Sequence, residues 1–320
     1  MNPILEKIKR IGLVPVIKID DAEKAVPLAR ALSDGGIPVA EVTFRTDCAA
    51  EAIANIAREL PDVLVGAGTV VSVEQVKAAV DAGAKYIISP GFDSEVVKYC
   101  IENDIPITPG CSSASDVGKA VKLGLECVKF FPAETVGGLK ALKALAGPFP
   151  KMKFIPTGGI NPDNLGSYLA FNKIIACGGS WMVPQKLVDA NDWQGITEIA
   201  RQAVTAMLNL RIVHIGINSD DEATCRNTCA LLSKILCAPL DERSKSIFVT
   251  KEFEVMKFKG VGTHGHIGIG TSSVPRAIEY FTSQGIEFDA DSITYDDAGE
   301  PKFVYFKGEF GGFGIHLVNA

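Results

Sequence analysis

One lysine in an apolar segment has the setting of a carbonyl-attacking nucleophile. Lys129 lies in CVKFFP (127–132), where apolar and aromatic residues flank it and a proline follows. This composition predicts a short buried strand. Burial disfavours the charged ammonium, and a neutral amine attacks carbonyl carbon. Lys129 is therefore a candidate to form a Schiff base with a ketone. The alternative is a lysine at a strand end whose ammonium reaches water.

The segments around Lys129 predict the fold that positions it. Eight short apolar runs occur, each followed by a segment of helical character: 13–19, 39–44, 64–69, 86–90, 105–110, 127–132, 153–159 and 174–180. Segments 21–32 and 72–82 are clear helices, because Asp or Ser begins them and alanine is frequent. Eight strand–helix pairs predict an α/β fold, a parallel sheet closed into a (β/α)8 TIM barrel. An open doubly wound sheet is the alternative, but it usually carries Gly-x-Gly-x-x-Gly after strand one, where this chain has KIDD (18–21).

In such a barrel, chemistry takes place at the carboxyl ends of the strands. Those ends hold a nucleophile, Lys129, a carboxylate, Glu41, and a guanidinium, Arg45. The other candidates there are Lys18, Thr69, Pro90, Pro109, Thr157, Gly158, Gly159, Gly178, Gly179 and Ser180. Glycines after the last two strands let backbone amides approach an anion, the usual phosphate position of this fold. Simpler interpretations remain open, because glycine pairs are often only turns and Glu41 with Arg45 could form a surface ion pair.

Six motifs arrive in the order and spacing of one enzyme family: EVTFRT (41–46), GAGT (66–69), SPG (89–91), VKFFPA (128–133), PTGGI (156–160) and GGSW (178–181). They resemble the aldolases of 2-keto-3-deoxy-6-phosphogluconate (KDPG) and 2-keto-4-hydroxyglutarate (KHG), over about residues 1–206. The resemblance implies a class I aldolase on a TIM barrel, commonly a trimer, that uses no cofactor. It implies Lys129 as the Schiff-base lysine, Glu41 as general acid and base, Arg45 and Thr69 at the substrate carboxylate, and Gly158, Gly159 and Ser180 at the phosphate end. Lys18 stands where relatives often have an arginine or another residue.

These residues lead us to expect an aldolase for small 2-keto acids. KDPG would give pyruvate and glyceraldehyde 3-phosphate, and KHG would give pyruvate and glyoxylate. Another pyruvate-dependent aldolase, such as one for the epimeric 2-keto-3-deoxy-6-phosphogalactonate, is an alternative, because strand-end residues do not exclude that stereochemical change. A third hypothesis is a ligand-sensing protein with an inactive barrel, which an intact Lys129/Glu41 pair argues against.

The sequence pattern changes after an amphipathic segment at 194–210, which predicts domains at 1–207 and 208–320. VHIGIN (213–218) recurs as GHIGIG (265–270), and each copy precedes a helical segment and later strands. This predicts a duplicated βαβββ unit. It resembles the vicinal oxygen chelate superfamily of glyoxalase I and the extradiol dioxygenases. The matching metal-ligand positions are His214, Glu254, His266 and His316, the last usually a glutamate in that superfamily. A divalent metal is thus one expectation, and a metal-free fold for assembly or ligand sensing is the other.

The composition of the chain argues against some classes of binding partner and indicates a cellular location. The 320 residues carry a net charge of -6 without a basic stripe, which argues against nucleic acid. No apolar run is long enough to cross a membrane, and the first segment lacks the apolar core of a signal peptide. The eight cysteines are scattered without a Cys-x-x-Cys pair, so we expect reduced thiols and a cytoplasmic location. Cys225 and Cys229 would share a helix face, a spacing more typical of packing than of metal binding.

Overall fold

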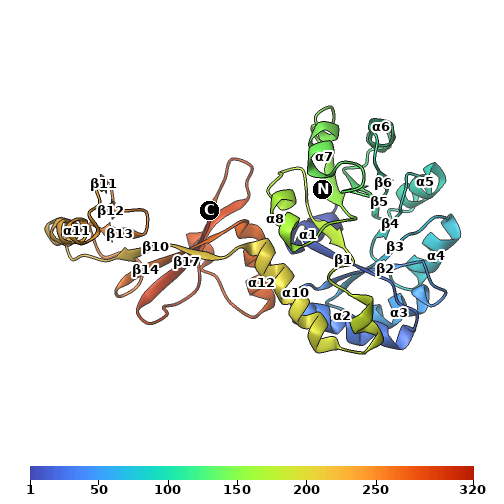
Figure 1. Cartoon of the computed structure of the whole chain (residues 1–320), viewed down its shortest axis with the longest axis horizontal. Coiled ribbons are helices and arrows are strands. Elements are labelled where there is room, and N and C mark those ends of the chain that lie inside the picture. The colour runs from blue at the N-terminus through green and yellow to red at the C-terminus, as the bar shows by residue number, and fades with distance from the viewer. The chain divides into compact units, whose positions relative to one another are not determined.

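The computed structural model of the chain covers residues 1–320, which form two compact units, Met1–Met207 and Leu208–Ala320 (Figure 1). None of its helices combines the length and the apolar character that a membrane span requires. All eight cysteines are free thiols.

The first unit alternates strands and helices along its whole length. Its strands are β1 (Leu13–Ile17), β2 (Val39–Thr43), β3 (Leu64–Gly68), β4 (Ile87–Ile88), β5 (Ile107–Thr108), β6 (Gly110–Cys111), β7 (Cys127–Phe130), β8 (Lys153–Pro156) and β9 (Cys177–Gly179). Its helices are α1 (Pro3–Ile11), α2 (Ala25–Asp34), α3 (Ala49–Glu59), α4 (Val73–Asp81), α5 (Ser94–Glu102), α6 (Ala114–Lys122), α7 (Gly138–Ala146), α8 (Pro162–Leu169), α9 (Gln185–Asp189) and α10 (Trp193–Leu208), with a 3-10 turn η1 (Ala22–Lys24).

The strands of this unit follow one another around a ring. One sheet has the order β5-β4-β3-β2-β1-β9 and a second has the order β6-β7-β8, and every pairing is parallel. A parallel bridge between Thr157 and Gly178 joins β8 to β9. At the other junction between the two sheets, the amide of Gly110 in β6 donates to the carbonyl of Ser89, the residue after β4, at 3.0 Å. The unit is therefore an α/β fold whose strands point the same way and end at one rim, with the helices outside (Figure 1).

The strands are shorter than the apolar runs that predict them. The fifth run, 105–110, is split into β5 and β6 at Pro109, because proline has no N–H to donate to a ladder. The segment predicted as one helix at 21–32 begins instead with η1, and the α-helix starts at Ala25. The helix predicted at 194–210 is α10, which ends at Leu208.

Side-chain caps fix the start of several helices that follow the rim. Ser72 accepts from the Gln75 amide at the start of α4, and Asp93 accepts from two amides at the start of α5. Asn161 and Asn164 form a reciprocal capping box at α8, followed by Pro162 at its first turn. Each cap satisfies amides that a helix start leaves without a partner. The loops between strand ends and helices are thereby held in defined positions.

The second unit contains two halves with the same order of elements, a strand, a helix and three further strands. Its elements are β10 (Arg211–Ile217), α11 (Glu222–Leu236), β11 (Leu240–Glu242), β12 (Ser246–Val249), β13 (Phe253–Met256), then β14 (Gly265–Thr271), α12 (Val274–Ser283), β15 (Thr294–Tyr295), β16 (Pro301–Tyr305) and β17 (Phe313–Asn319), with a 3-10 turn η2 (Ala290–Ser292). They build one sheet in the order β11-β12-β13-β10-β14-β17-β16-β15. The first strands of the two halves, β10 and β14, pair antiparallel at its centre.

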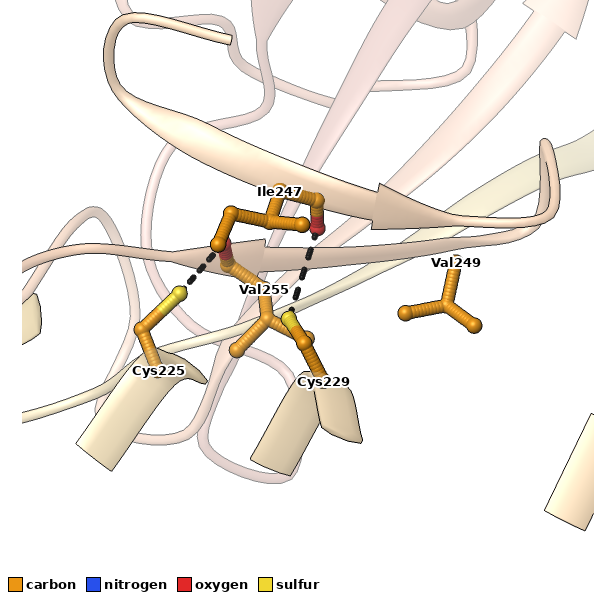
Figure 2. Packing of buried hydrophobic residues seen from close by; sticks show 5 residues of the cluster. All are labelled: Cys225, Cys229, Ile247, Val249 and Val255. Carbon is orange, nitrogen blue, oxygen red and sulfur yellow. Dashed lines mark hydrogen bonds between the residues drawn. The ribbon is translucent and has the colours of Figure 1, made fainter. Parts of the chain in front are cut away.

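The two helix cysteines of this unit belong to its core. Cys225 and Cys229 are fully buried on α11 and pack with Ile247, Val249 and Val255 of β12 and β13. Figure 2 shows the thiols directed at strand carbonyls, Cys225 at Val255 and Cys229 at Ile247. Burial raises the pKa of Cys229 to about 12. They are packing residues, as their spacing predicts, because a protonated thiol in an apolar core is neither a ligand nor a nucleophile.

Candidate functional site

The first unit brings a lysine and a carboxylate together inside its ring. Lys129 Nζ donates to Glu41 Oε1 at 3.1 Å, and the two residues are only 5% and 1% exposed. Glu41 lies on β2 and Lys129 on β7, which are not neighbours in either sheet. The two side chains therefore meet across the interior near the carboxyl ends of their strands.

The neighbours of Glu41 leave room for its carboxylate and for little else. A β-carbon at Gly68 of β3 would overlap the carboxylate of Glu41, so only glycine allows this approach. Tyr86 is fully buried nearby and donates to the Ala40 carbonyl at 3.1 Å. Burial, and secondarily the charge of Glu41, raises the pKa of Tyr86 well above its usual value. The phenol thus stays protonated and supports β2 from the side.

Besides Glu41, Lys129 contacts a backbone carbonyl and an aromatic ring. Its amide donates to the Pro109 carbonyl at 2.9 Å, and its ammonium lies 5.4 Å from the centre of the Phe131 ring. Pro90 borders the same junction, because a side chain at Gly110 would overlap the Pro90 carbonyl. Phe131 and Tyr86 carry no functional signal in the sequence, because an aromatic residue in a strand is most often only part of the core.

A second pair of predicted residues meets at the rim. Arg45 Nε donates to Thr69 Oγ1 at 3.2 Å, and Arg45 is exposed. Thr69 has a left-handed φ of 56°, a conformation that costs about 1–3 kcal/mol in a non-glycine residue. The surrounding loop therefore holds Thr69 in a backbone conformation that threonine disfavours. The hydroxyl of Thr69 faces the guanidinium of Arg45, a group that can bind a carboxylate.

The glycine-rich loop after β8 adopts backbone conformations that favour glycine. Gly158 and Gly159 have φ of 97° and 82°, and a β-carbon at Gly159 would overlap the side chain of Glu134. Tyr168 of α8 donates to the Glu134 carboxylate. This contact ties the loop after β7 to the helix that follows the glycine loop, and no sequence pattern indicates it.

The remaining candidates occupy different surroundings. Thr157 is buried, and its hydroxyl has no hydrogen-bond partner although it lies beside Gly178. Ser180 follows β9 and is exposed. Lys18 follows β1 with a half-exposed side chain, and it pairs with Asp20 at 2.9 Å rather than with another candidate.

Comparison with known proteins identifies the first unit. Residues 4–199 match the family described as KDPG and KHG aldolase. The chain belongs to this family. It is 48% identical over 204 residues to the 2-dehydro-3-deoxy-phosphogluconate aldolase of Treponema pallidum, which covers 64% of this chain and 97% of that relative. It is also 48% identical over 192 residues to the KHG/KDPG aldolase of Escherichia coli, with 60% and 90% covered.

A solved structure agrees with the fold of the aldolase unit. The crystal structure of KDPG aldolase from Legionella pneumophila, with pyruvate captured at low pH as a covalent carbinolamine intermediate, matches with a TM-score of 0.61 at 40% identity. The match covers 63% of this chain and 98% of that one. The second unit, Leu208–Ala320, lies outside the family match.

The second unit holds a cluster of four predicted metal ligands, here called the four-ligand cluster: His214, Glu254, His266 and His316. Nε2 of His214 lies 3.1 Å from Nε2 of His266 and 3.1 Å from Nε2 of His316. Oε2 of Glu254 lies 3.2 Å from Nε2 of His266 and 3.6 Å from Nε2 of His214. The structure thus brings together all four positions, from four adjacent strands.

The protonation states of the cluster suit a cation. Burial, then the charge of His266, lowers the pKa of His214. Burial, then His214 and His266, lowers the pKa of His316 to about 3. Burial opposes ionisation of Glu254, but hydrogen bonds from His266 and Ser246 prevail and lower its pKa. At neutral pH the imidazoles of His214 and His316 are therefore neutral, and Glu254 is ionised.

Hydrogen bonds within the four-ligand cluster cannot satisfy all of its imidazole nitrogens at once. Each neutral imidazole nitrogen carries either one lone pair or one proton. Nε2 of His214 nevertheless faces two other imidazole nitrogens and a carboxylate oxygen. The ligating atoms of the three histidines all lie within 4.8 Å of one another. A cation among them would use every lone pair at once, so the donor set fits a metal.

Proposed function

We propose that this protein is a class I aldolase whose residues 1–207 form a (β/α)8 barrel. It cleaves KDPG to pyruvate and glyceraldehyde 3-phosphate, and KHG to pyruvate and glyoxylate, which makes it a carbon–carbon lyase. The observation that carries the proposal is the buried contact between Lys129 and Glu41 at 3.1 Å. Family membership over residues 4–199 supports the same reaction.

The two residues divide the chemistry. Lys129 passes a proton to Glu41 and attacks the C2 ketone as a neutral amine. Glu41 returns that proton to the C2 hydroxyl, which leaves as water, and a protonated imine remains. Glu41 accepts the C4 hydroxyl proton as the C3–C4 bond breaks, the aldehyde leaves, and the electron pair forms an enamine. Glu41 then returns the proton to C3, and water hydrolyses the pyruvate imine. Such proton transfer contributes roughly 10²–10⁴-fold when the carboxylate is within hydrogen-bond reach.

The anionic ends of the substrate suit the rim residues. Arg45 presents a guanidinium for two parallel hydrogen bonds to the substrate carboxylate. The hydroxyl oxygen of Thr69 lies 3.2 Å from Nε of Arg45. For the phosphate we propose the backbone at Gly158, Gly159 and Gly178, with Ser180. Thr157 and Pro90 would line the space between, and the exposed Lys18 would lie at the edge.

Trapping with borohydride tests the nucleophile. Pyruvate and borohydride should add one reduced pyruvyl group to the wild type, on the peptide that holds Lys129. The Lys129→Ala variant should stay unlabelled, whereas Lys153→Ala, at a strand start, should label normally. Equal labelling of Lys129→Ala would mean that another amine is the nucleophile.

An assay that couples pyruvate release to a dehydrogenase separates the alternatives. Turnover of KDPG and KHG supports this proposal, whereas turnover of the epimeric phosphogalactonate alone indicates the related aldolase. Ligand binding without turnover would indicate a sensor with an inactive barrel. We also propose a homotrimer formed through the aldolase unit and a cytoplasmic location, which sedimentation and fractionation test.

For the second unit we propose a vicinal oxygen chelate domain made of two paired βαβββ units that binds a divalent metal at the four-ligand cluster. Three imidazoles and one carboxylate suit zinc, nickel, iron(II) or manganese better than calcium or magnesium. Such an ion would supply Lewis-acid chemistry to an oxygen ligand. The observation that favours this second function is the convergence of Nε2 of His266 and Nε2 of His316 on Nε2 of His214, with Glu254 Oε2 3.2 Å from Nε2 of His266.

Elemental analysis tests the metal. The full chain, grown with ample metal, should hold close to one ion, and His214→Ala/His266→Ala should lose it. His264→Ala, an exposed histidine outside the cluster, should retain it. Aldolase activity should survive chelation, because the chemistry of Lys129 needs no ion. Well below one ion per chain, without uptake on reconstitution, would make the domain structural or regulatory.

A further inference from the structure

The face of the second sheet that carries the four-ligand cluster also carries a cation. Asp241 pairs with Phe248 and Phe248 pairs with Glu254 across neighbouring antiparallel strands. Directly paired side chains point to the same face of a sheet. The guanidinium carbon of Arg243 lies 3.9 Å from the centre of the Phe248 ring. Arg243 is therefore on the ligand face, beside the cluster.

The neighbours of Arg243 in sequence confirm this orientation. Glu242 points to the opposite face, where Arg226 of α11 binds it. Arg243 takes no part in that network. Its Nε and Nη2 both donate to Asp241 Oδ2, at 3.0 and 2.9 Å. A guanidinium has five N–H donors, so Arg243 keeps donors for a further anion, and its side chain is 56% exposed.

The corresponding side of the cluster in the second half is aromatic. Tyr305 pairs with His316 just as Phe248 pairs with Glu254. The Phe303 ring lies 4.5 Å from the His316 ring, and the Tyr305 ring lies 5.2 Å from it. A molecule at the cluster would thus meet a cation on one side and aromatic rings on the other.

The separation between the cluster and Arg243 sets the length of such a molecule. Phe248 lies between them along the sheet, because its strand β12 stands between β11, which Arg243 follows, and β13, which carries Glu254. The centre of its ring is 6.2 Å from the centre of the His214 ring and 3.9 Å from the guanidinium carbon of Arg243. One carboxylate cannot reach across an aromatic ring to both positions. A molecule with two anionic ends, about one ring width apart, can contact both.

We propose that the second unit binds a 2-oxo dicarboxylate. Its 2-oxo acid end meets the metal ion of the four-ligand cluster through two adjacent oxygen atoms, and its distal carboxylate meets Arg243. The inference rests on the metal site proposed above. KHG, a proposed substrate of the aldolase unit, is itself a 2-oxo dicarboxylate, so both units would bind the same chemical class.

The test uses the full chain loaded with Co²⁺, whose visible absorption reports only on ligands of the ion and not on imines at Lys129. The probes are 2-oxoglutarate and 2-oxovalerate, which have the same chain length and differ in the distal carboxylate. A hydrogen bond to a charged group favours 2-oxoglutarate by about tenfold or more in Kd. Arg243→Met should abolish this preference and Arg243→Lys should retain part of it. Lys234→Met, which removes an exposed cation of α11 on the opposite face of the sheet, should leave the preference unchanged.

Measurement of Co²⁺ content in each variant separates the two proposals. A wild-type chain that takes up no Co²⁺ overturns the metal site and this inference together. A chain that takes up Co²⁺ but binds both acids equally overturns the inference alone. So does an Arg243→Met variant with full Co²⁺ content and an unchanged preference.

Discussion

The Gly68→Ala variant tests whether the placement of Glu41 against Lys129 controls the rate. A methyl group at position 68 would lie 2.6 Å from Cγ and 2.8 Å from Cδ of Glu41. Carbon atoms in contact are about 3.5–4.0 Å apart, so the carboxylate has to retreat by about 1 Å. The present distance of 3.1 Å from Oε1 to Nζ is already near the upper end of the range of about 2.6–3.2 Å for proton transfer.

A displacement of about 1 Å at a reacting group costs about 10²-fold in rate. We therefore expect kcat of Gly68→Ala to fall about 100-fold in the coupled pyruvate assay. The pyruvyl adduct should still be trapped by borohydride, because the amine of Lys129 is intact. Overpacking should also destabilise the unit by about 1–3 kcal/mol, so the assay is run well below the melting temperature.

Gly118→Ala is the matched control, because a methyl group there meets no atom within 4 Å. It should keep wild-type turnover. If Gly68→Ala is folded and turns over within about threefold of the wild type, the carboxylate is not held as tightly as the rate argument requires.

Three further predictions concern single groups. Glu41→Gln keeps the shape and removes the base, so turnover should fall roughly 10²–10⁴-fold while the pyruvyl adduct is still trapped; near-normal turnover would assign the proton to another group. Arg45→Ala should raise KM for both KDPG and KHG, whereas Gly159→Ala, strained at φ 82°, should weaken KDPG more than KHG. Equal loss on both substrates for Gly159→Ala would place the phosphate elsewhere. Hydrogen bonds from Arg226 and Lys257 lower the pKa of Glu242 from 4.5 to about 2, so the stability from this carboxylate is present above pH 4.5 and is lost as the pH falls toward 2. Unfolding midpoints of the wild type and Arg226→Met should therefore differ at pH 6 and converge near pH 2, and a difference independent of pH would exclude the charge as its cause.

The rim of the aldolase unit could be predicted because its signal is local. Apolar runs alternate with helical segments, and parallel strands bring their carboxyl ends to one side. This places Glu41 and Lys129 at the same rim without any knowledge of contacts. It does not predict that they touch, because β2 and β7 are not paired and their distance depends on the closure of the ring.

Other features of the site depend on contacts between distant segments. Gly68 is a strand glycine in the sequence, and only the packing shows that it makes room for a carboxylate. The contact between Tyr168 of α8 and Glu134 of the loop after β7 joins two residues that are 34 positions apart in the sequence. The missing N–H of Pro109 indicates a break in the strand, but the apolar run around it favours one continuous strand.

The His-Ile-Gly repeat of the second unit explains why the cluster forms where the two halves join. In the antiparallel pair β10 and β14, His214 lies opposite Gly268 and His266 lies opposite Gly216. Each imidazole therefore lies over a residue without a side chain, and a β-carbon at either glycine would overlap the facing ring. The glycine is as necessary as the histidine, and the informative pattern is His-x-Gly on both strands.

The outer two of the proposed ligands follow the same rule on the neighbouring strands. Glu254 of β13 is in register with Gly216, and His316 of β17 is in register with Gly268. Each glycine thus separates two ligands across the sheet and lets both side chains lean over it. Each half supplies one proposed ligand from its first strand and one from its last, and each glycine makes room for a proposed ligand of the other half. A single half has two ligands and lacks the partner's glycine beneath its histidine, so the complete donor set exists only when both halves are joined through β10 and β14.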